Sequence, residues 1–247
     1  MFLLTHSMIN QYGIILQMKK KQPIIYIPDE EFTNFKEIKT GNMAAGVLYR
    51  SSSPLKGGDE KKAKETLAIN AGIKCVINLD DSVSVIEKLS EAVPWYHELV
   101  MQKKVICLPM GFIIPGVAFN EKKLKTALQF MIAHEGPYLI HCFAGVDRTG
   151  FVAALLEALM GASLKEICRN YLSAFHADNS VSYRLENYRK LKNFLVQIKK
   201  MAHGKNITSI NIQIAAEYYL LHDVRLSQKE INKLKKILIT HSMIDQL

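Results

Sequence analysis

Hydrophobic and polar residues follow two different periods along most of the chain, and their alternation predicts an α/β fold. Short apolar runs with the length of buried strands occur at 46–50, 73–79, 105–110 and 138–141. Longer segments with helical spacing occur at 59–71, 85–92, 120–135, 151–160, 164–175, 182–202 and 208–222. Strands that alternate with helices favour a central, mostly parallel sheet flanked by helices, followed here by a helical C-terminal extension.

Two serines mark the starts of helices in this C-terminal part. Ser163 with Glu166, and Ser227 with Glu230, have the spacing of a capping box, in which each side chain bonds the other residue's backbone N–H. We therefore expect one helix to begin after Ser163 and another after Ser227.

The first 22 residues show no clear period, so we expect a loosely held extension there. Residues 23–247 should form a single domain, including the C-terminal helices from about 163, because 247 residues are ample for one α/β core and short for two. Basic residues follow the first apolar residues, the reverse of a secretory signal peptide, and no apolar run is long enough to span a bilayer. We expect a cytoplasmic location without stable membrane insertion, while export without a signal peptide stays open.

The chain is basic, with 32 Lys and Arg against 23 Asp and Glu and a net charge of +9. This balance suits phosphorylated or otherwise anionic partners, although a well-solvated surface explains it equally well. No nucleic-acid motif accompanies the charge, so we expect no nucleic-acid partner. The four cysteines are widely spaced, which fits a reducing compartment and predicts no metal or other cofactor.

The segment 138–150 combines an apolar run, a His-Cys pair, a short loop and the start of a helical stretch. It predicts a buried strand, a tight loop and a helix, with Cys142 and Arg148 at the two ends of the loop. Such a loop points several backbone N–H groups into one concavity, where the helix dipole adds positive potential. A dianionic phosphate is the natural occupant, and sulfate or vanadate should also bind.

The side chains around this loop have the chemistry of a nucleophilic phosphate site. Arg148 offers a planar guanidinium that holds two phosphate oxygens, and the positive potential favours a Cys142 thiolate placed for in-line attack. His141 would hold the loop by hydrogen bonding, Thr149 would stabilise Cys142 as it leaves, and Gly145 lets the backbone turn. The alternative is a buried cysteine beside an unrelated arginine. The residues expected to surround the phosphate are Phe143, Ala144, Gly145, Val146, Asp147 and Arg148.

The spacing of His141-Cys142, five residues and Arg148-Thr149-Gly150 is similar to the signature loop of cysteine-dependent protein tyrosine and dual-specificity phosphatases. Its Asp-Arg-Thr ending most resembles bacterial tyrosine phosphatases that also accept phosphoinositides, and myotubularin-type lipid phosphatases. A weaker resemblance extends from Asn34 to Leu238 and includes the Leu-Tyr-Arg-Ser segment that ends at Ser51. The resemblance implies a tyrosine phosphatase-like fold and metal-independent hydrolysis of phosphate monoesters.

The general acid has two candidates. Expelling a phenolate or alkoxide needs a proton donor near the leaving oxygen, and many tyrosine phosphatases place an aspartate for this after a Trp-Pro pair. That motif does not occur here. In families with the Asp-Arg-Thr ending the loop aspartate is thought to be the acid, which implies Asp147. Asp80 or Asp81 is the second candidate, because a ligand site in an open sheet lies at the carboxyl ends of strands. Either carboxylate could instead orient the loop.

Two departures from the family's pattern bear on these expectations. Where related enzymes carry an Asp-Leu-Arg turn, this sequence has Asn78-Leu79-Asp80, which weakens the transfer of a role to Asp80. Related loops often have lysine at the position of Val146, and its loss should weaken attraction for inositol headgroups.

We therefore expect a phosphotyrosine protein as substrate. A phosphoinositide or another inositol phosphate is the first alternative, and a catalytically weak phosphate-binding module is the second. The apolar residues of 111–117 would suit an aromatic substrate or, equally, the core. Arg50 is a candidate second phosphate contact, with a salt bridge at a strand end as the alternative. Lys103-Lys104 is the other basic pair that could receive a headgroup.

Overall fold

A five-stranded sheet in the order β1-β2-β5-β3-β4 runs through the middle of the protein. The computed structural model describes residues 33–58, 60–111, 120–174, 181–202 and 212–239. β1 pairs antiparallel with β2, and the other neighbours are parallel, which confirms the predicted mostly parallel sheet. The strands are β1 (Lys36–Ile38), β2 (Leu48–Ser51), β3 (Cys75–Asn78), β4 (Val105–Cys107) and β5 (Tyr138–His141).

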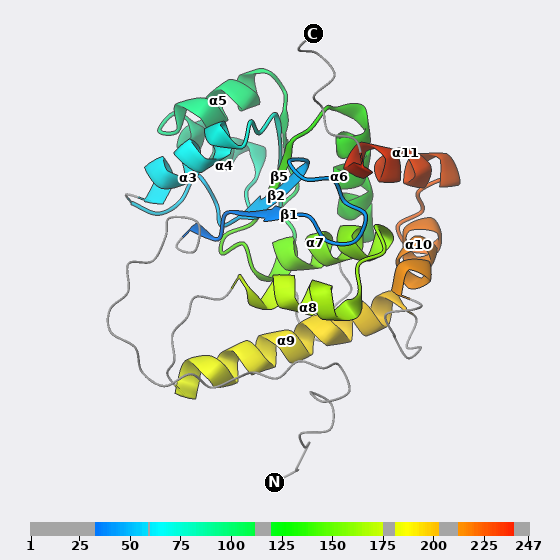
Figure 1. Cartoon of the computed structure of the whole chain (residues 1–247). Helices are drawn as coiled ribbons and strands as arrows, with labels where there is room; N and C mark the ends of the chain where they lie inside the picture. Colours follow the sequence, from blue (N-terminus) through cyan, green and yellow to red (C-terminus); the bar gives the residue numbers. More distant parts are fainter. Residues whose placement is uncertain (1–32, 59, 112–119, 175–180, 203–211, 240–247) are drawn as a thin grey trace.

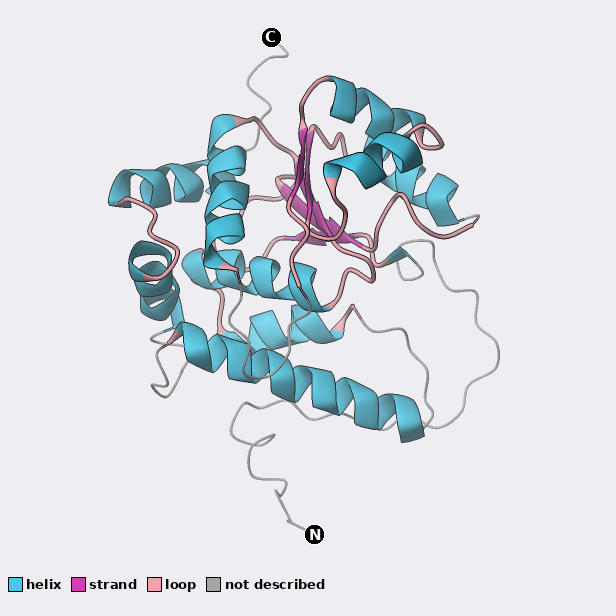
Figure 2. Ribbon diagram, turned by 180° about the vertical axis from the view of Figure 1, so that it is seen from behind, coloured by secondary structure: helices cyan, strands magenta, loops and turns pink. Residues whose placement is uncertain are grey.

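Helices cover both faces of this sheet (Figures 1 and 2). The three helices α3, α4 and α5 lie on one side, and α6 and α7 lie on the other. α8 and α9 pack beyond α7, α10 packs on α7, and α11 packs on α6. Their bounds are α3 (Glu60–Asn70), α4 (Val83–Ser90), α5 (Pro94–Met101), α6 (Glu121–Ala133), α7 (Asp147–Leu159), α8 (Leu164–Leu172), α9 (Val181–Met201), α10 (Ile212–His222) and α11 (Gln228–Ile239).

The central strand β5 is buried on both faces, which explains its continuous apolar sequence. Tyr138 and Ile140 belong to the apolar cluster on the side of α6 and α7, whereas Leu139 belongs to the cluster on the side of α3, α4 and α5. Alternate residues thus point to opposite faces, as the pleat of a strand requires. The strand is fixed from both sides.

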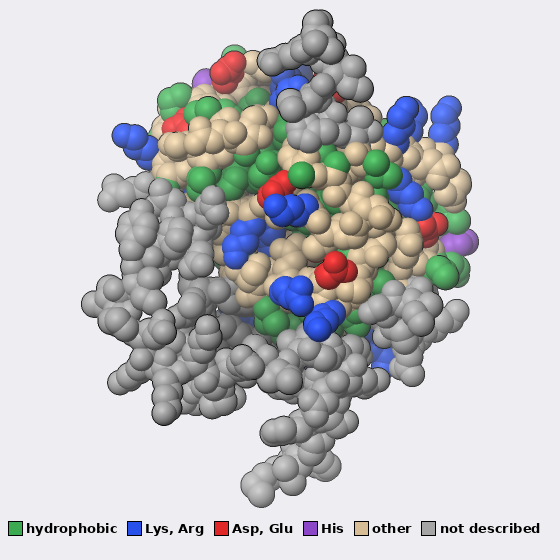
Figure 3. Space-filling view, in the orientation of Figure 1, with side chains coloured by type: hydrophobic (Ala, Val, Ile, Leu, Met, Phe, Trp, Pro, Cys, Tyr) green, Lys and Arg blue, Asp and Glu red, His purple; other side chains and the backbone are tan. Residues whose placement is uncertain are grey.

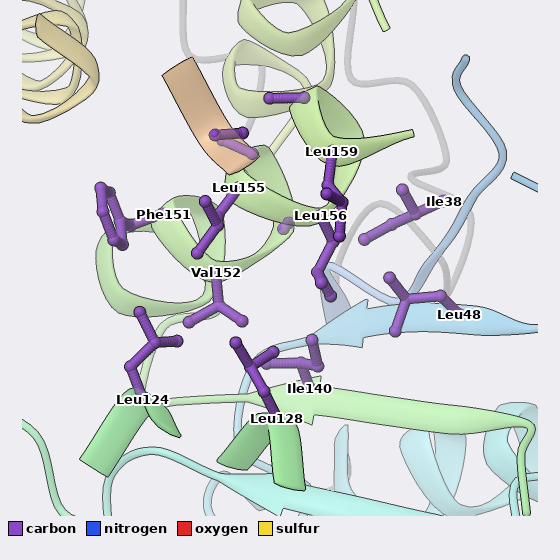
Figure 4. Packing of buried hydrophobic residues seen from close by; sticks show 14 of the residues in the cluster. Ile38, Leu48, Leu124, Leu128, Ile140, Phe151, Val152, Leu155, Leu156 and Leu159 are labelled. Carbon is purple, nitrogen blue, oxygen red and sulfur yellow. The ribbon is translucent and has the colours of Figure 1, made fainter. Parts of the chain in front are cut away.

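α7 is the most deeply placed helix, with every residue from Arg148 to Leu159 buried. A helix that is apolar all round needs partners all round, and here the sheet, α8, α9 and α10 supply them. Figure 4 shows the contact between α7, α6 and the strands. The labelled side chains are Ile38, Leu48, Leu124, Leu128, Ile140, Phe151, Val152, Leu155, Leu156 and Leu159. Because α7 is packed on all sides, the position of its first turn relative to the sheet is well defined.

Several element boundaries differ from those predicted. The helix expected at 151–160 begins at Asp147, because the Gly150 N–H already bonds the Val146 carbonyl at 2.8 Å. The strand expected at 105–110 ends at Cys107. α5 was not predicted, since its eight residues are short for a helical period; Pro94 starts it, as proline does at a first helical position.

Both predicted capping boxes are present. The Ser163 hydroxyl accepts from the Glu166 N–H, and the Glu166 carboxylate accepts from the Ser163 N–H. Ser227 and Glu230 make the same pair of bonds. The expected extension 1–22 and residues 112–117 of the apolar segment 111–117 lie outside the described residues, so those expectations stay predictions.

Lys and Arg side chains are spread over the face shown in Figure 3 rather than gathered into one stripe. Among the helices that the structure describes, none combines the length and apolar character needed to cross a bilayer.

Replacing Leu128 with alanine should destabilise the protein. Leu128 is fully buried between α7 and the sheet, so truncation leaves a cavity and should lower the free energy of unfolding by about 2–5 kcal/mol. Denaturant-induced unfolding followed by circular dichroism measures the change. Ile214→Ala is the matched control, because Ile214 is 70% exposed and its loss should cost little. Equal losses in the two variants would contradict this account of the core.

Candidate functional site

Three neighbouring strands end at the same level, and the candidate site lies just beyond them. Ser51 of β2, His141 of β5 and Asn78 of β3 are partners in the parallel register. Because the strands are parallel, the segments that follow these residues meet at one edge of the sheet. The loop 142–146 between β5 and α7 therefore lies between the segments that follow β2 and β3.

The backbone of this loop is held from outside by three hydrogen bonds to successive carbonyls. The Ser53 N–H donates to the Phe143 carbonyl at 3.0 Å. Asn34 Nδ2 donates to the Ala144 carbonyl at 2.9 Å, and Arg50 Nη2 donates to the Gly145 carbonyl at 2.7 Å.

These bonds fix the direction of the loop's N–H groups. In a trans peptide the C=O of one residue and the N–H of the next point in opposite directions. With the carbonyls of 143, 144 and 145 turned outward, the N–H groups of Ala144, Gly145 and Val146 turn inward. The result is a backbone nest ahead of a helix N-terminus, which suits an anion.

Two glycines are required by close contacts in this region. Gly145 has a φ of +70°, and a Cβ there would lie 2.4 Å from the Ser51 carbonyl oxygen. A Cβ on Gly150 would lie 2.7 Å from the ring of Tyr171. The first glycine lets the loop turn against β2, and the second lets α8 pack on α7.

Cys142 and Arg148 bracket the loop as predicted. Cys142 is 3% exposed at the end of β5, and Arg148 lies in the first turn of α7. Arg148 Nη1 donates to the carbonyls of Leu79 and Met110 at 3.1 and 3.2 Å, and pairs with Asp80 Oδ1 at 2.8 Å. These three contacts hold the guanidinium between the segments that follow β3 and β4.

The two candidate acids have different neighbours. Asp80 Oδ2 accepts a hydrogen bond from Lys56, so both oxygens of this carboxylate face a cation. Partial burial opposes ionisation, but the bonds from Lys56 and Arg148 prevail and lower the pKa of Asp80. Asp147 is half-buried and accepts a hydrogen bond from the Tyr171 hydroxyl at 3.1 Å.

His141 belongs to a buried network that reaches β3 and α5. Asn78 Oδ1 accepts from the N–H groups of Asp80 and Asp81, which identifies Nδ2 as its donor to Tyr96 Oη at 3.2 Å. The Tyr96 hydroxyl, already an acceptor, can then donate to His141 Nε2 at 3.0 Å. Burial lowers the pKa of His141 to about 4. His141 is thus neutral. Its hydrogen bond ties it to Tyr96 of α5, and its Nδ1 has no hydrogen-bond partner within the described part of the chain, so the expected hydrogen bond to the loop stays a prediction.

Arg50 and Glu157 are two buried ionisable residues whose charges influence each other. Arg50 is 1% exposed, and its burial lowers its pKa while negative charge at Glu157 and Cys142 opposes that change. Burial raises the pKa of Glu157 to about 7, although Thr40 donates to its Oε1 at 2.7 Å. Arg50 holds the loop carbonyl from below, so this geometry does not favour its predicted contact with a second phosphate.

The structure brings most of the predicted residues together and separates others. Thr149 lies buried in the first turn of α7, and its hydroxyl has no hydrogen-bond partner within the part of the chain described. Lys103 and Lys104 precede β4, so they lie at the edge of the sheet opposite Cys142. The headgroup contact expected from this lysine pair is therefore not supported.

Sequence reasoning missed several residues that support the loop. Lys56, Tyr96 and Tyr171 have no local signal of chemistry in the sequence. Asn34 begins the segment that resembles the bacterial family, but that resemblance gave it no role at the loop. Asn34 has a φ of +53°, which asparagine tolerates better than most residues, but sequence does not reveal that angle.

Comparisons with known proteins agree with the signature loop. The sequence model described as "Tyrosine phosphatase family" matches residues 32–240. A tyrosine-protein phosphatase from Nostoc commune is 27% identical over 155 residues, which are 56% of this chain and 53% of that protein. The chain thus spans about half the length of this curated relative.

Two solved structures are also similar. One is the core catalytic domain of the PP-IP phosphatase SIW14 from S. cerevisiae in complex with citrate. It has 20% identity and a TM-score of 0.37, and the match covers 65% of this chain and 98% of that one. The other is a Siw14 catalytic core with 19% identity and a TM-score of 0.40, covering 70% and 98% of the two chains.

The raised pKa of Glu157 predicts a specific pH dependence of stability. Between its ordinary value of 4.5 and about 7, the folded protein keeps a proton that the unfolded chain releases. The free energy of unfolding should therefore fall as pH rises through this window, by at most about 3 kcal/mol (2.5 pH units at 1.36 kcal/mol each). Glu157→Gln cannot ionise, so its stability relative to wild type should grow with pH. Chemical denaturation from pH 4.5 to 8 measures the difference.

Taking this difference cancels the titration of His141, which occurs in both proteins. Glu217→Gln is the control, because that carboxylate is 36% exposed in a surface pair with Lys235. Wild-type and Glu157→Gln curves that run parallel would rule out the assigned ionisation.

Proposed function

We propose that this chain, which belongs to the tyrosine phosphatase family, hydrolyses phosphate monoesters through a phosphocysteine intermediate. The observation that carries the proposal is the inward-facing nest of N–H groups between Cys142 and Arg148. Such donors stabilise charge on the equatorial phosphoryl oxygens as it develops, at no reorganisation cost.

The reaction takes two steps. The Cys142 thiolate attacks phosphorus, the bond to the leaving oxygen breaks, and Asp147 gives its proton to that oxygen. Water then attacks the phosphocysteine, Asp147 takes back a proton, and inorganic phosphate and the thiolate are released. The buried Thr149 hydroxyl is suited to donate to the sulfur as it leaves.

Asp147 is a better acid than Asp80 in this arrangement. Asp80 faces two cations that keep it ionised and occupy both of its oxygens. Asp147 lies half-buried at the start of α7, beside the loop, and accepts a hydrogen bond from a neutral hydroxyl rather than from a cation.

Phosphotyrosine protein is the substrate we propose. The Phe143 ring is 60% exposed on the loop and offers an aromatic face beside the phosphate nest. A polyphosphorylated inositol headgroup would need further cations. Arg50 is buried, Lys103 and Lys104 lie at the opposite edge, and Lys56 is already bound by two carboxylates. These features support an aryl phosphate over a polyanionic headgroup.

Phosphate release by wild type and by Cys142→Ser tests the function. The substrates are p-nitrophenyl phosphate, a phosphotyrosine peptide and a phosphoinositide panel, each with a metal chelator present. We expect turnover by wild type, fastest on the phosphopeptide among the biological substrates. Loss of the nucleophile should reduce the rate at least about 10⁴-fold.

Other outcomes discriminate between the alternatives. Faster release from a phosphoinositide than from the peptide would favour lipid phosphatase activity. Binding of phosphate without release from any substrate would favour a phosphate-binding module. Undiminished turnover by Cys142→Ser would eliminate the covalent mechanism.

Asp147→Asn should slow substrates with poor leaving groups far more than substrates with good ones. A poor leaving group needs its proton in the transition state, so we expect a loss of about 10²–10⁴-fold for alkyl phosphates or phosphotyrosine. For p-nitrophenyl phosphate the loss should be much smaller. Steady-state kcat across a series of aryl and alkyl phosphates measures this slope.

Asp80→Asn is the matched control for this series. It should lower activity by a similar factor for every leaving group, because Asp80 holds Arg148 rather than the leaving oxygen. If the loss of kcat depended on the leaving group in Asp80→Asn but not in Asp147→Asn, Asp80 would be the general acid and Asp147 would not.

A further inference from the structure

Lys56 is a partly buried lysine beside the phosphate site, and the proposed reaction steps assign it no role. Its Nζ bonds Asp80 Oδ2 and Asp81 Oδ1, the latter at 2.7 Å. The same ammonium lies 5.2 Å from the centre of the Phe143 ring. Lys56 therefore contacts both the segment after β3 and the loop after β5.

The backbone that carries Lys56 is held firmly. Lys64 is a buried cation of α3 that donates to the carbonyls of Ser53 and Lys56, both at 3.1 Å. The Ser53 N–H in turn donates to the Phe143 carbonyl. A lysine on a turn tied down at both ends loses less conformational freedom when it binds its partners.

Each carboxylate oxygen of Asp80 pairs with a different cation. Oδ1 pairs with Arg148 Nη1 at 2.8 Å, and Oδ2 pairs with Lys56. Without Lys56, the group formed by Asp80, Asp81 and Arg148 would carry a net charge of −1 (two carboxylates and one guanidinium), which would oppose the approach of a phosphate dianion. With Lys56 present, the two cations balance the two carboxylates.

We propose that Lys56 is a positioning residue of the phosphate site, which acts through Asp80 to orient Arg148 and to keep its positive charge available to an oxyanion. The inference rests on the proposed phosphatase function. Asp81 supports the arrangement from the other side, because it binds Lys56 and is itself held by Asn78 Nδ2. Partial burial opposes the charge of Lys56, but the hydrogen bonds that its ammonium donates to both aspartates prevail and raise its pKa, so it stays charged.

The test is tungstate binding in a double-variant cycle. Tungstate is a tetrahedral dianion that binds without a covalent step, and isothermal titration calorimetry gives its Kd. The proteins are wild type, Lys56→Met, Asp80→Asn and the double variant Lys56→Met/Asp80→Asn. Lys56→Met should weaken binding about tenfold in the wild-type background and less than about twofold in the Asp80→Asn background.

Two further variants complete the comparison. Lys56→Arg keeps a cation that can reach both aspartates, so its Kd should stay within about twofold of wild type. Lys39→Met removes a surface lysine that pairs with Glu37 at 3.1 Å, and it should leave tungstate binding unchanged. If Lys56→Met does not fold, Lys56→Gln takes its place in the cycle.

The outcomes separate this inference from the function on which it rests. A wild type that binds tungstate and hydrolyses p-nitrophenyl phosphate, with an unchanged Kd in Lys56→Met, would overturn the inference alone. The same tenfold loss in both backgrounds would also overturn it, because Lys56 would then act on the anion directly. A wild type that neither binds tungstate nor releases phosphate would overturn the proposed function and the inference together.

Discussion

The outward hydrogen bonding of the carbonyls of 143, 144 and 145 is the constraint on which the site depends. A loop of this length could turn its peptide groups either way, and only one choice leaves N–H groups facing an anion. Asn34, Arg50 and Ser53 make that choice from three different places in the chain. The Arg50 bond is the costly one, because it requires a guanidinium buried to 1% exposure.

The arrangement of β2, β5 and α7 offsets the free energy needed to bury the Arg50 guanidinium. Arg50 comes from β2, which is paired in register with β5, so its side chain reaches the loop that β5 feeds. Glu157 comes from α7, two to three turns after the loop, and its charge partly compensates Arg50. α7 is buried on all sides, so the helix that supplies the dipole and Arg148 cannot shift relative to the sheet. The packing of α7 thus also holds the candidate site in place.

The sequence predicted the features that lie within one contiguous segment, but not the contacts between residues far apart in the chain. The strand, loop and helix at 138–160 follow from a contiguous pattern, as does the pairing of Cys142 with Arg148 around the loop. By contrast, Asn34 bonds Ala144 across 110 positions, and Arg50 bonds Gly145 across 95. Such contacts depend on which strands become neighbours. For the same reason Lys103 and Lys104 were expected beside the site, although they precede a parallel strand and so lie at its other edge.

Asp80 and Asp147 both lie beside the phosphate nest, but their different neighbours favour different proposed roles. Asp80 meets Lys56 and Arg148, so its most stable state is a carboxylate that accepts from both and never needs a proton. Asp147 accepts a hydrogen bond from the Tyr171 hydroxyl, which orients one of its oxygens. For the acid role that we propose for Asp147, a neutral partner is better suited than a cation, because a cation holds a carboxylate in its ionised form. The same reasoning explains why a family pattern that places arginine at position 80 does not carry over: a cation there would face Arg148 and Lys56, whereas the aspartate links them.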